Sequence, residues 1–123
     1  KVLKCIKNNL KFPIHGKGLT KREFIFDEDF NDAFYKVIKR GKLGKIYHFS
    51  TNCYVSIKSI IEILCKSKNL KYKDFVYNTL DRKGKDKYYF LDCNKTSKEL
   101  KWKPKNNLIQ GLNKTIKYYD KEL

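Results

Sequence analysis

Amphipathic helical patterns and short strand-like runs alternate along this chain, and this alternation is the strongest constraint on its fold. Apolar residues recur at helical spacing in four segments, which predicts helices over residues 1–10, 27–41, 57–65 and 108–123. A fifth helix is predicted over residues 95–102, between a polar cap and Pro104. Aromatic and β-branched residues predict short strands over residues 23–26, 45–49, 72–80 and 87–92. Interleaved helices and strands indicate an α/β fold, and we expect a single domain over residues 1–123.

Polar residues mark the starts of the predicted helices, because a side-chain oxygen can accept a hydrogen bond from a free N–H of the first turn. The candidate caps are Asp27 or Asp29, Ser56, Asp92 or Asn94, and Asn107. Gly41 stops the second helix. We expect the apolar stripe of that helix to face the core, and the stripe consists of Phe30, Phe34, Val37 and Ile38.

The predicted strands are few and short, and connections of uneven length separate them. We therefore expect them to form the edge of a sheet that is completed elsewhere. The sequence begins at Lys1 and contains no methionine. We interpret the chain as a piece of a longer protein.

The formal net charge of +16 raises the question of nucleic-acid binding. The excess is almost all lysine, which is spread over every segment, and arginine occurs only at Arg22, Arg40 and Arg82. Surfaces that read bases or clamp phosphates favour arginine because its planar group forms paired hydrogen bonds. We therefore do not expect a nucleic-acid partner, and a stand-alone basic nucleic-acid-binding module is kept as the alternative.

Two further features bear on the environment of the protein. The sequence has no apolar run of about 18 residues and no apolar stretch typical of a signal peptide at its start, so we expect a cytoplasmic protein without a membrane partner. The cysteines are widely spaced and form no CxxC pair, which argues against a metal site and a disulfide framework. We expect buried or half-buried reduced thiols at Cys5, Cys53, Cys65 and Cys93.

Three stretches, taken in order, resemble the extended short-chain dehydrogenase/reductase enzymes that act on nucleotide sugars. "PIHGKGLTKREFIFDEDFNDAF" is similar to a P-I-x-G-x-G turn followed by R-[DE], an aromatic strand and an acidic helix start. "GKLGKIYHFSTNCYVSIKSIIEIL" is similar to a G-x-x-G-x-x-Y strand, a polar loop and a Ser-capped helix. "DRKGKDKYYFLDCNKTSKELKWKP" is similar to the D-R-P-G-H-D loop, aromatic strand, D-x-x-K and E-L-G-W-x-P of the family ending.

This resemblance covers essentially the whole chain and implies the C-terminal, substrate-binding portion of such an enzyme without its N-terminal Rossmann domain. The loop at residues 81–86 is most like that of the dTDP-glucose 4,6-dehydratases, which are lyases. An epimerase or decarboxylase of the same family remains open. The resemblance also implies NAD bound by the missing Rossmann domain, a nucleoside-diphosphate sugar as substrate, and a homodimer of the full-length enzyme.

The chain by itself is not expected to turn over substrate. The stretch "HGKG" at residues 15–18 is too short for the glycine-rich dinucleotide fingerprint, and we predict no strand before it. No Tyr-x-x-x-Lys pair is expected beside a cofactor fold. We therefore assign no catalytic, cofactor-binding or metal-binding residue to this chain.

The resemblance assigns substrate binding to Lys1, Arg22, Asn52, Asp81, Arg82, Lys85 and Asp86. Arg82 would hold the diphosphate through its fixed pair of donors, and Asp81 would orient Arg82. Gly84 would let the loop turn close to the ligand. Lys85 replaces the histidine of the family pattern but can still donate to a phosphate or ribose oxygen, and Asp86 would brace the loop or accept a hydrogen bond from a hydroxyl.

The remaining assignments come from other segments. Arg22 would make a second phosphate contact from across the cleft, unless it is a surface arginine paired with Glu23 or Asp27. Asn52 would face the nucleotide from a loop, and Lys1 would begin the helix that follows a sugar-contacting loop. Lys101 stands where the family has glycine, so it either tolerates a side chain or takes a left-handed conformation at about 1 kcal/mol.

Overall fold

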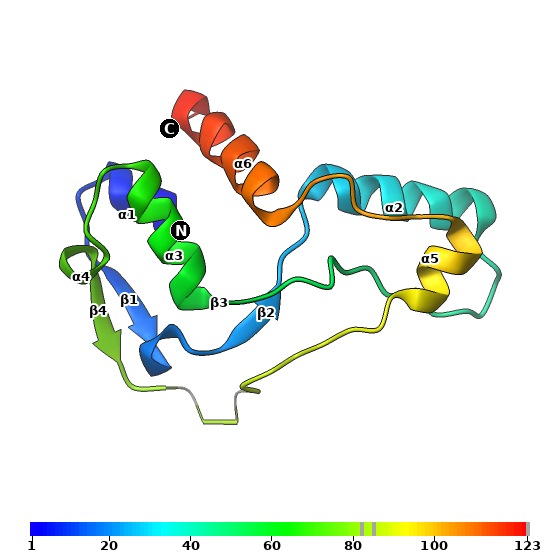
Figure 1. The fold of residues 1–123 in the computed structure, drawn as a ribbon, viewed down its shortest axis with the longest axis horizontal. Helices are drawn as coiled ribbons and strands as arrows, with labels where there is room; N and C mark the ends of the chain where they lie inside the picture. Colours follow the sequence, from blue (N-terminus) through cyan, green and yellow to red (C-terminus); the bar gives the residue numbers. More distant parts are fainter. Residues whose placement is uncertain (82, 85, 123) are drawn as a thin grey trace.

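The computed structural model describes residues 1–81, 83–84 and 86–122. Two groups of elements lie at opposite ends of an elongated molecule (Figure 1). The first group consists of α1 (Val2–Lys7), β1 (Phe12–His15), α3 (Ile57–Ser67), α4 (Tyr72–Phe75) and β4 (Val76–Thr79). The second consists of α2 (Asp27–Arg40) and α5 (Asn94–Leu100). Between them lie η1 (Gly16–Gly18), β2 (Lys21–Glu23), β3 (Tyr54–Ser56) and α6 (Leu108–Glu122).

The four strands in the described part of the chain form two separate pairs. β1 and β4 are parallel, with Phe12 opposite Val76. β2 and β3 are antiparallel, with Glu23 opposite Tyr54. The alternation of helices and strands that the sequence predicts is therefore confirmed, and each strand pair is short.

Several strand boundaries differ from the sequence prediction. β1 was not predicted, because Pro13 indicated a turn; a proline is tolerated there since the pair has only edge strands. Residues 45–49 form no strand: the His48 N–H donates to the hydroxyl of Thr96 at 3.1 Å instead of to a neighbouring strand. Residues 72–75 form α4, and only residues 76–79 are extended as β4.

The other two predicted strands are shifted or shortened. The strand expected over residues 23–26 lies at β2, a few residues earlier. The run expected over residues 87–92 makes one parallel bridge, between Lys21 and Tyr88.

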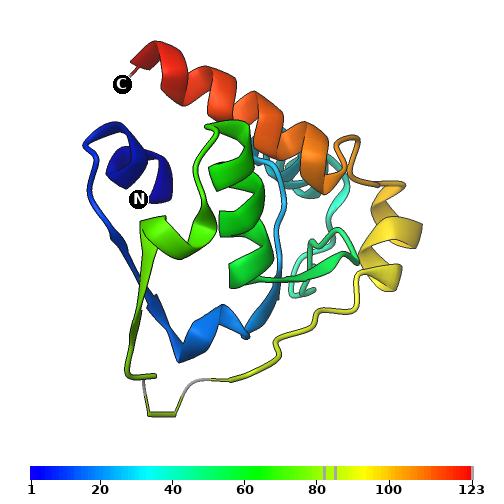
Figure 2. The same ribbon diagram turned by 60° about the vertical axis from the view of Figure 1, so that its left-hand side comes forward.

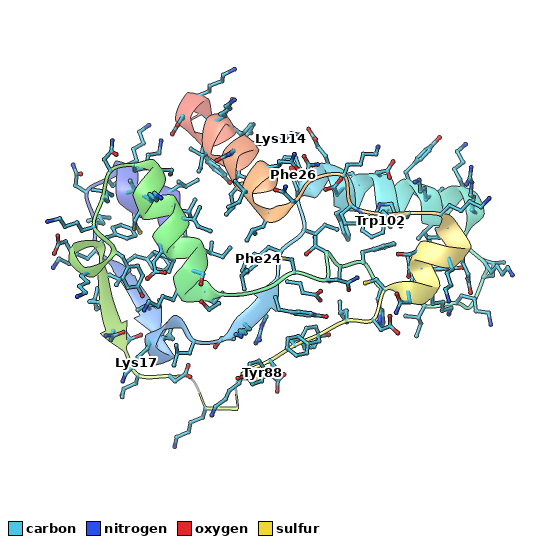
Figure 3. The ribbon with its side chains drawn as sticks, viewed as in Figure 1. Lys17, Phe24, Phe26, Tyr88, Trp102 and Lys114 are labelled. Atoms are coloured by element: carbon cyan, nitrogen blue, oxygen red, sulfur yellow. The ribbon has the colours of Figure 1, made fainter. Side chains whose placement is uncertain are left out.

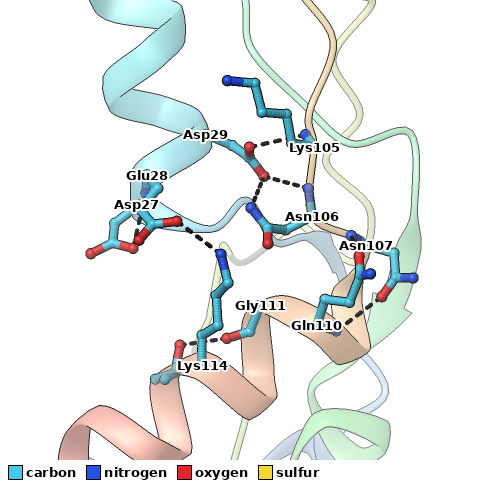
Figure 4. A network of polar contacts seen from close by, with 10 residues as sticks. Asp27, Glu28, Asp29, Lys105, Asn106, Asn107, Gln110, Gly111 and Lys114 are labelled. Atoms are coloured by element: carbon cyan, nitrogen blue, oxygen red, sulfur yellow. Dashed lines mark hydrogen bonds and ion pairs between the residues drawn. The ribbon is translucent and has the colours of Figure 1, made fainter.

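Helix starts follow the predicted caps in two cases. The hydroxyl of Ser56 accepts a hydrogen bond from the Ser59 N–H at 3.0 Å and caps α3. Asn107 and Gln110 cap α6 reciprocally, each side chain accepting from the other residue's N–H at 2.9 Å (Figure 4).

The caps predicted for the other two helices are wrong. Phe26 precedes α2, and the carboxylate of Asp27 accepts from the adjacent Glu28 N–H. Cys93 precedes α5 and makes no side-chain cap, while the carboxylate of Asp92 accepts from the Asn94 N–H at 2.8 Å.

Three clusters of buried side chains form the core. Ile14, Ile61, Cys65 and Phe75 pack between α3 and the parallel strands, and Ile60, Leu64 and Ile116 pack between α3 and α6. Ala33, Leu100 and Trp102 join α2 to α5 and the chain that follows it.

The apolar stripe expected to bury α2 is only partly correct. Val37 packs against the third cluster, whereas Phe30, Phe34 and Ile38 are 44%, 54% and 67% exposed. The reason is that α5 covers one side of α2, where the small side chain of Ala33 allows close approach.

Asp29 ties the start of α2 to the chain that leads into α6 (Figure 4). Its carboxylate accepts hydrogen bonds from the backbone N–H groups of Lys105 and Asn106 and from the Asn106 side chain. Burial alone raises the pKa of Asp29, but these bonds and the nearby Lys105 charge lower its pKa overall.

Lys101 has φ 49° and ψ 45° and ends α5 in the left-handed conformation, which is one of the two outcomes expected at that position. The four cysteines carry free thiols: Cys65 and Cys93 are buried, while Cys5 and Cys53 are partly exposed. Among the described helices, none combines the length and apolar character that crossing a bilayer requires.

Candidate nucleotide-sugar site

The segment that follows the 81–86 loop runs beside β2. The Lys21 N–H donates to the Lys87 carbonyl at 3.0 Å, and Lys21 forms a parallel bridge with Tyr88. Figure 3 shows Tyr88 on this long extended segment, below β2. Two stretches that are distant in sequence and belong to different motifs thus lie side by side.

Arg22 makes the contact that joins the two stretches. Its Nη2 donates to the backbone oxygen of Asp86 at 2.8 Å, and its Nη1 donates to the Lys21 carbonyl at 2.7 Å. Both acceptors are neutral, and no ion pair links Arg22 to Glu23 or Asp27, all of which the structure describes. The charge of the guanidinium is therefore not neutralised by either acid, and its remaining N–H groups can donate to an anionic ligand.

The carboxyl ends of β1 and β4 lie next to the start of the same loop. His15 Nδ1 is 2.8 Å from the Thr79 hydroxyl and 3.0 Å from the Leu80 carbonyl oxygen. Gly16 has φ +54°, and a Cβ there would lie 2.3 Å from a carboxylate oxygen of Asp81. A glycine is needed at this position so that Asp81 can lie against η1, and the carboxyl ends of parallel strands commonly border ligand sites.

The loop itself is described in part. Arg82 and Lys85, two of the predicted substrate-binding residues, lie outside the described residues. Gly84 has φ +71° with open space where a Cβ would be, as expected for a glycine that lets the loop turn. Asp86 is exposed and takes part through its backbone oxygen.

Two of the predicted substrate-binding residues, Asn52 and Lys1, do not lie beside Arg22 and the loop. Asn52 is exposed with φ 52°, and its N–H donates to the Ser50 hydroxyl at 3.3 Å; within the described residues no hydrogen bond joins it to Arg22 or Asp86. Lys1 precedes α1, and Figures 1 and 2 both place the N-terminus away from the loop.

The structure adds a cluster that the sequence analysis did not assign to the site. Glu23 Oε2 accepts a hydrogen bond from the Leu91 N–H at 3.3 Å. The Tyr54 ring lies 4.1 Å from the Phe90 ring, centre to centre. The sequence predicted Glu23 only as a possible ion partner of Arg22. Its place in a strand next to that arginine was the one sequence signal for a role at the site.

Burial and charge perturb two groups next to Glu23. Burial raises the pKa of the Tyr54 phenol, and the negative charge of Glu23 raises it further. The pKa of the Cys93 thiol is raised by burial first and by Glu23 second, against a lowering hydrogen bond with Ser50. Glu23 is therefore the charge that contributes most to the raised pKa of both groups.

Two cavities help to locate the site. A small one of about 150 Å³ lies between β2 and the 89–91 stretch, and its lining includes Arg22, Glu23, Ser50 and Tyr89. The larger groove, about 750 Å³, lies between residues 24–28 and α6. None of the predicted substrate-binding residues that the structure describes lines the larger groove, where Lys114 pairs with Glu28 at 2.9 Å.

One expectation about cofactor motifs is wrong, because a strand, β1, precedes the "HGKG" stretch. The Tyr-x-x-x-Lys spacing occurs at Tyr35 and Lys39 and at Tyr54 and Lys58. That no such pair lies beside a cofactor fold stays a prediction. Lys39 Nζ lies 5.6 Å from the Tyr35 ring centre on exposed α2. Among the described residues, no group of three or more His, Cys, Asp and Glu side chains is arranged to hold a metal ion.

Comparison with known proteins gives a consistent result. No protein-family model matches the chain. A dTDP-glucose 4,6-dehydratase of Haemophilus influenzae is 34% identical over 117 residues, which cover 87% of this chain and 35% of that protein. A dTDP-glucose 4,6-dehydratase of Streptomyces venezuelae, solved with NAD and TYD bound, aligns with a TM-score of 0.92 at 27% identity, covering 98% of this chain and 37% of that one.

This chain resembles one part of the dTDP-glucose 4,6-dehydratases. The resemblance stated from the sequence is thereby confirmed, and the fold is that of part of an extended short-chain dehydrogenase/reductase. The chain spans about a third of the length of the curated relatives it matches. A UDP-glucose 4-epimerase of Thermotoga maritima shares the fold, with a TM-score of 0.88 at 21% identity over 98% of this chain and 38% of that one.

Proposed function

We propose that this chain is the substrate-binding portion of a nucleotide-sugar 4,6-dehydratase and that it clamps the nucleoside diphosphate of the substrate. The observation that carries the proposal is the 2.8 Å bond from Arg22 Nη2 to the Asp86 carbonyl. It brings an arginine from one family motif to the loop of another, 64 residues away in sequence. The guanidinium that remains available there supports phosphate binding.

The clamp uses charges from both sides of the junction. A diphosphate carries several negative oxygens, which Arg22 from β2 and Arg82 and Lys85 from the loop would neutralise. Asp81 would orient the loop. Asn52 and Lys1 stay as proposed outer contacts. Holding the nucleotide in this way orients the attached sugar, because binding energy remote from the reacting atoms can be used to position them.

NAD, which the relatives contain, does not fit the residues of this chain. The third glycine of a G-x-G-x-x-G fingerprint would fall at Lys21, and η1 leads into β2 rather than into a long helix. We assign NAD and the reaction steps to the rest of a longer enzyme, which we also expect to form the dimer. An epimerase or decarboxylase portion is the alternative, since the T. maritima epimerase shares the fold.

Calorimetric titration of the 123-residue chain with dTDP tests the proposal. Arg22→Ala should weaken binding by about tenfold or more, because it removes a charged donor to phosphate. Arg40→Ala is the matched control: Arg40 ends α2, is exposed, and should leave the affinity unchanged. A folded Arg22→Ala chain with unchanged dTDP affinity would refute the clamp.

A second titration addresses the alternative from another class. Binding to single-stranded RNA that falls steeply with salt, together with no preference for nucleoside diphosphates, would favour the basic nucleic-acid-binding module. Saturable dTDP binding that RNA does not compete away supports the clamp.

A further inference from the structure

Glu23 lies where several parts of the candidate site meet. It ends β2, and its Oε2 accepts a hydrogen bond from the Leu91 N–H at 3.3 Å. The same extended segment, residues 86–91, carries the Asp86 carbonyl that receives Arg22. One carboxylate therefore connects β2 to the segment at one end, while the arginine beside it connects them at the other.

Aromatic side chains pack beside the junction that Glu23 and Arg22 form. Tyr54 stands opposite Glu23 in the β2–β3 pair, and its ring packs 4.1 Å from Phe90 at an angle of 60°. Phe90 also lies 5.8 Å from the Tyr88 ring. Tyr54, Phe90 and Tyr88 are 39%, 54% and 59% exposed, so this packing leaves the junction partly open to solvent.

The second carboxylate oxygen of Glu23, Oε1, is also buried. The Tyr54 phenol interacts with this carboxylate, because besides burial the charge of Glu23 and a side-chain hydrogen bond with it raise the pKa of Tyr54. The Glu23 carboxylate is therefore held between Tyr54 of β3 and the Leu91 N–H of the extended segment.

We propose that Glu23 is a positioning residue that fixes the backbone at Leu91 and thereby holds the Asp86 carbonyl against Arg22, so that the free N–H groups of Arg22 face the phosphate. This inference rests on the proposed function. Glu23 itself does not touch the ligand, because its negative charge would repel a phosphate. Its contribution is the acceptor oxygen, and a glutamine can supply the same acceptor.

The test compares three variants of the 123-residue chain: Glu23→Ala, Glu23→Gln and, as control, Glu62→Ala. Glu62 is a half-exposed acid on α3 that pairs with Lys58 at 3.7 Å. Three quantities are measured: the dTDP affinity by calorimetry, the exchange rate of the Leu91 amide by NMR, and the thermal unfolding midpoint.

Glu23→Ala should weaken dTDP binding by about tenfold, which corresponds to one lost hydrogen bond to a charged acceptor. The Leu91 amide should exchange faster by a similar factor, while amides within α3 are unchanged and the midpoint moves by less than about 4 °C. Glu23→Gln should restore both affinity and protection. Glu62→Ala should behave as the unaltered chain.

Each contrary outcome has a defined meaning. Unchanged affinity in Glu23→Ala, in a chain that otherwise binds dTDP, overturns the inference and leaves the proposed function intact. A Glu23→Gln variant as weak as Glu23→Ala overturns the acceptor role, and a large fall of the midpoint shows a general structural role instead. If the unaltered chain does not bind dTDP, the proposed function fails. In that case, fast exchange of the Leu91 amide would also refute the claim that Glu23 fixes residues 86–91.

Discussion

Replacing Asp29 by alanine should lower the free energy of unfolding by about 3 kcal/mol. Asp29 is 2% exposed, and its carboxylate accepts three hydrogen bonds: 2.9 Å from Lys105 N, 3.0 Å from Asn106 N and 3.1 Å from Asn106 Nδ2 (Figure 4). A bond to a charged acceptor is worth about 1.5–3 kcal/mol. Lys105 is exposed and Asn106 is partly exposed, so water can accept from their N–H groups when the carboxylate is removed. The net loss is therefore about 1 kcal/mol for each of the three hydrogen bonds.

Urea unfolding followed by the fluorescence of Trp102, the single tryptophan, measures this loss. Glu28→Ala is the matched control one residue away. Glu28 pairs with Lys114 at 2.9 Å, but the two side chains are 65% and 49% exposed, so its loss should amount to less than about 1 kcal/mol. An Asp29→Ala chain within about 1 kcal/mol of the unaltered protein, or equal to Glu28→Ala, would refute the reasoning.

Three further predictions concern Asp29 and two positions with positive φ, Lys101 and Gly16. The pKa of Asp29 is lowered in the folded state. Its contribution to the free energy of unfolding is therefore present above the unfolded pKa of about 3.9 and is lost as the pH falls through the folded pKa. The free energy of unfolding, measured with urea from pH 7 to 2, should fall more in the unaltered protein than in Asp29→Asn. Lys101→Gly should raise the free energy of unfolding by about 1 kcal/mol, because glycine accepts φ 49° without strain, and an unchanged urea midpoint would contradict this. Gly16→Ala should lower the thermal midpoint by more than about 4 °C, since its Cβ would meet Asp81 at 2.3 Å, whereas the same change at Gly84, which also has positive φ but open space, should cost less.

Local signals allowed much of the fold to be predicted from the sequence. Ser56 and Asn107 start the helices expected of them, because a cap depends on residues three positions apart. The strand expected at residues 45–49 was wrong for a non-local reason. His48 bonds to Thr96, and Phe49 packs 5.4 Å from Trp102, so tertiary contacts rather than β-propensity set that backbone.

The residues of the candidate site that belong to family motifs could be predicted from the sequence. Arg22 and Asp86 were both expected there, and the structure joins them. The role of Glu23 depends on the approach of Leu91, which no sequence spacing indicates. Asn52 was assigned by the resemblance of its loop, and no hydrogen bond among the described residues brings it to Arg22.

An NMR titration of the isotope-labelled chain with dTDP, which maps the amides that shift, locates the nucleotide clamp directly. The largest changes should fall on β2, on the end of β4 and on residues 86–91, with saturation at a single site. Changes concentrated in the groove between residues 24–28 and α6, or spread evenly over the lysine-bearing surface, would contradict the clamp.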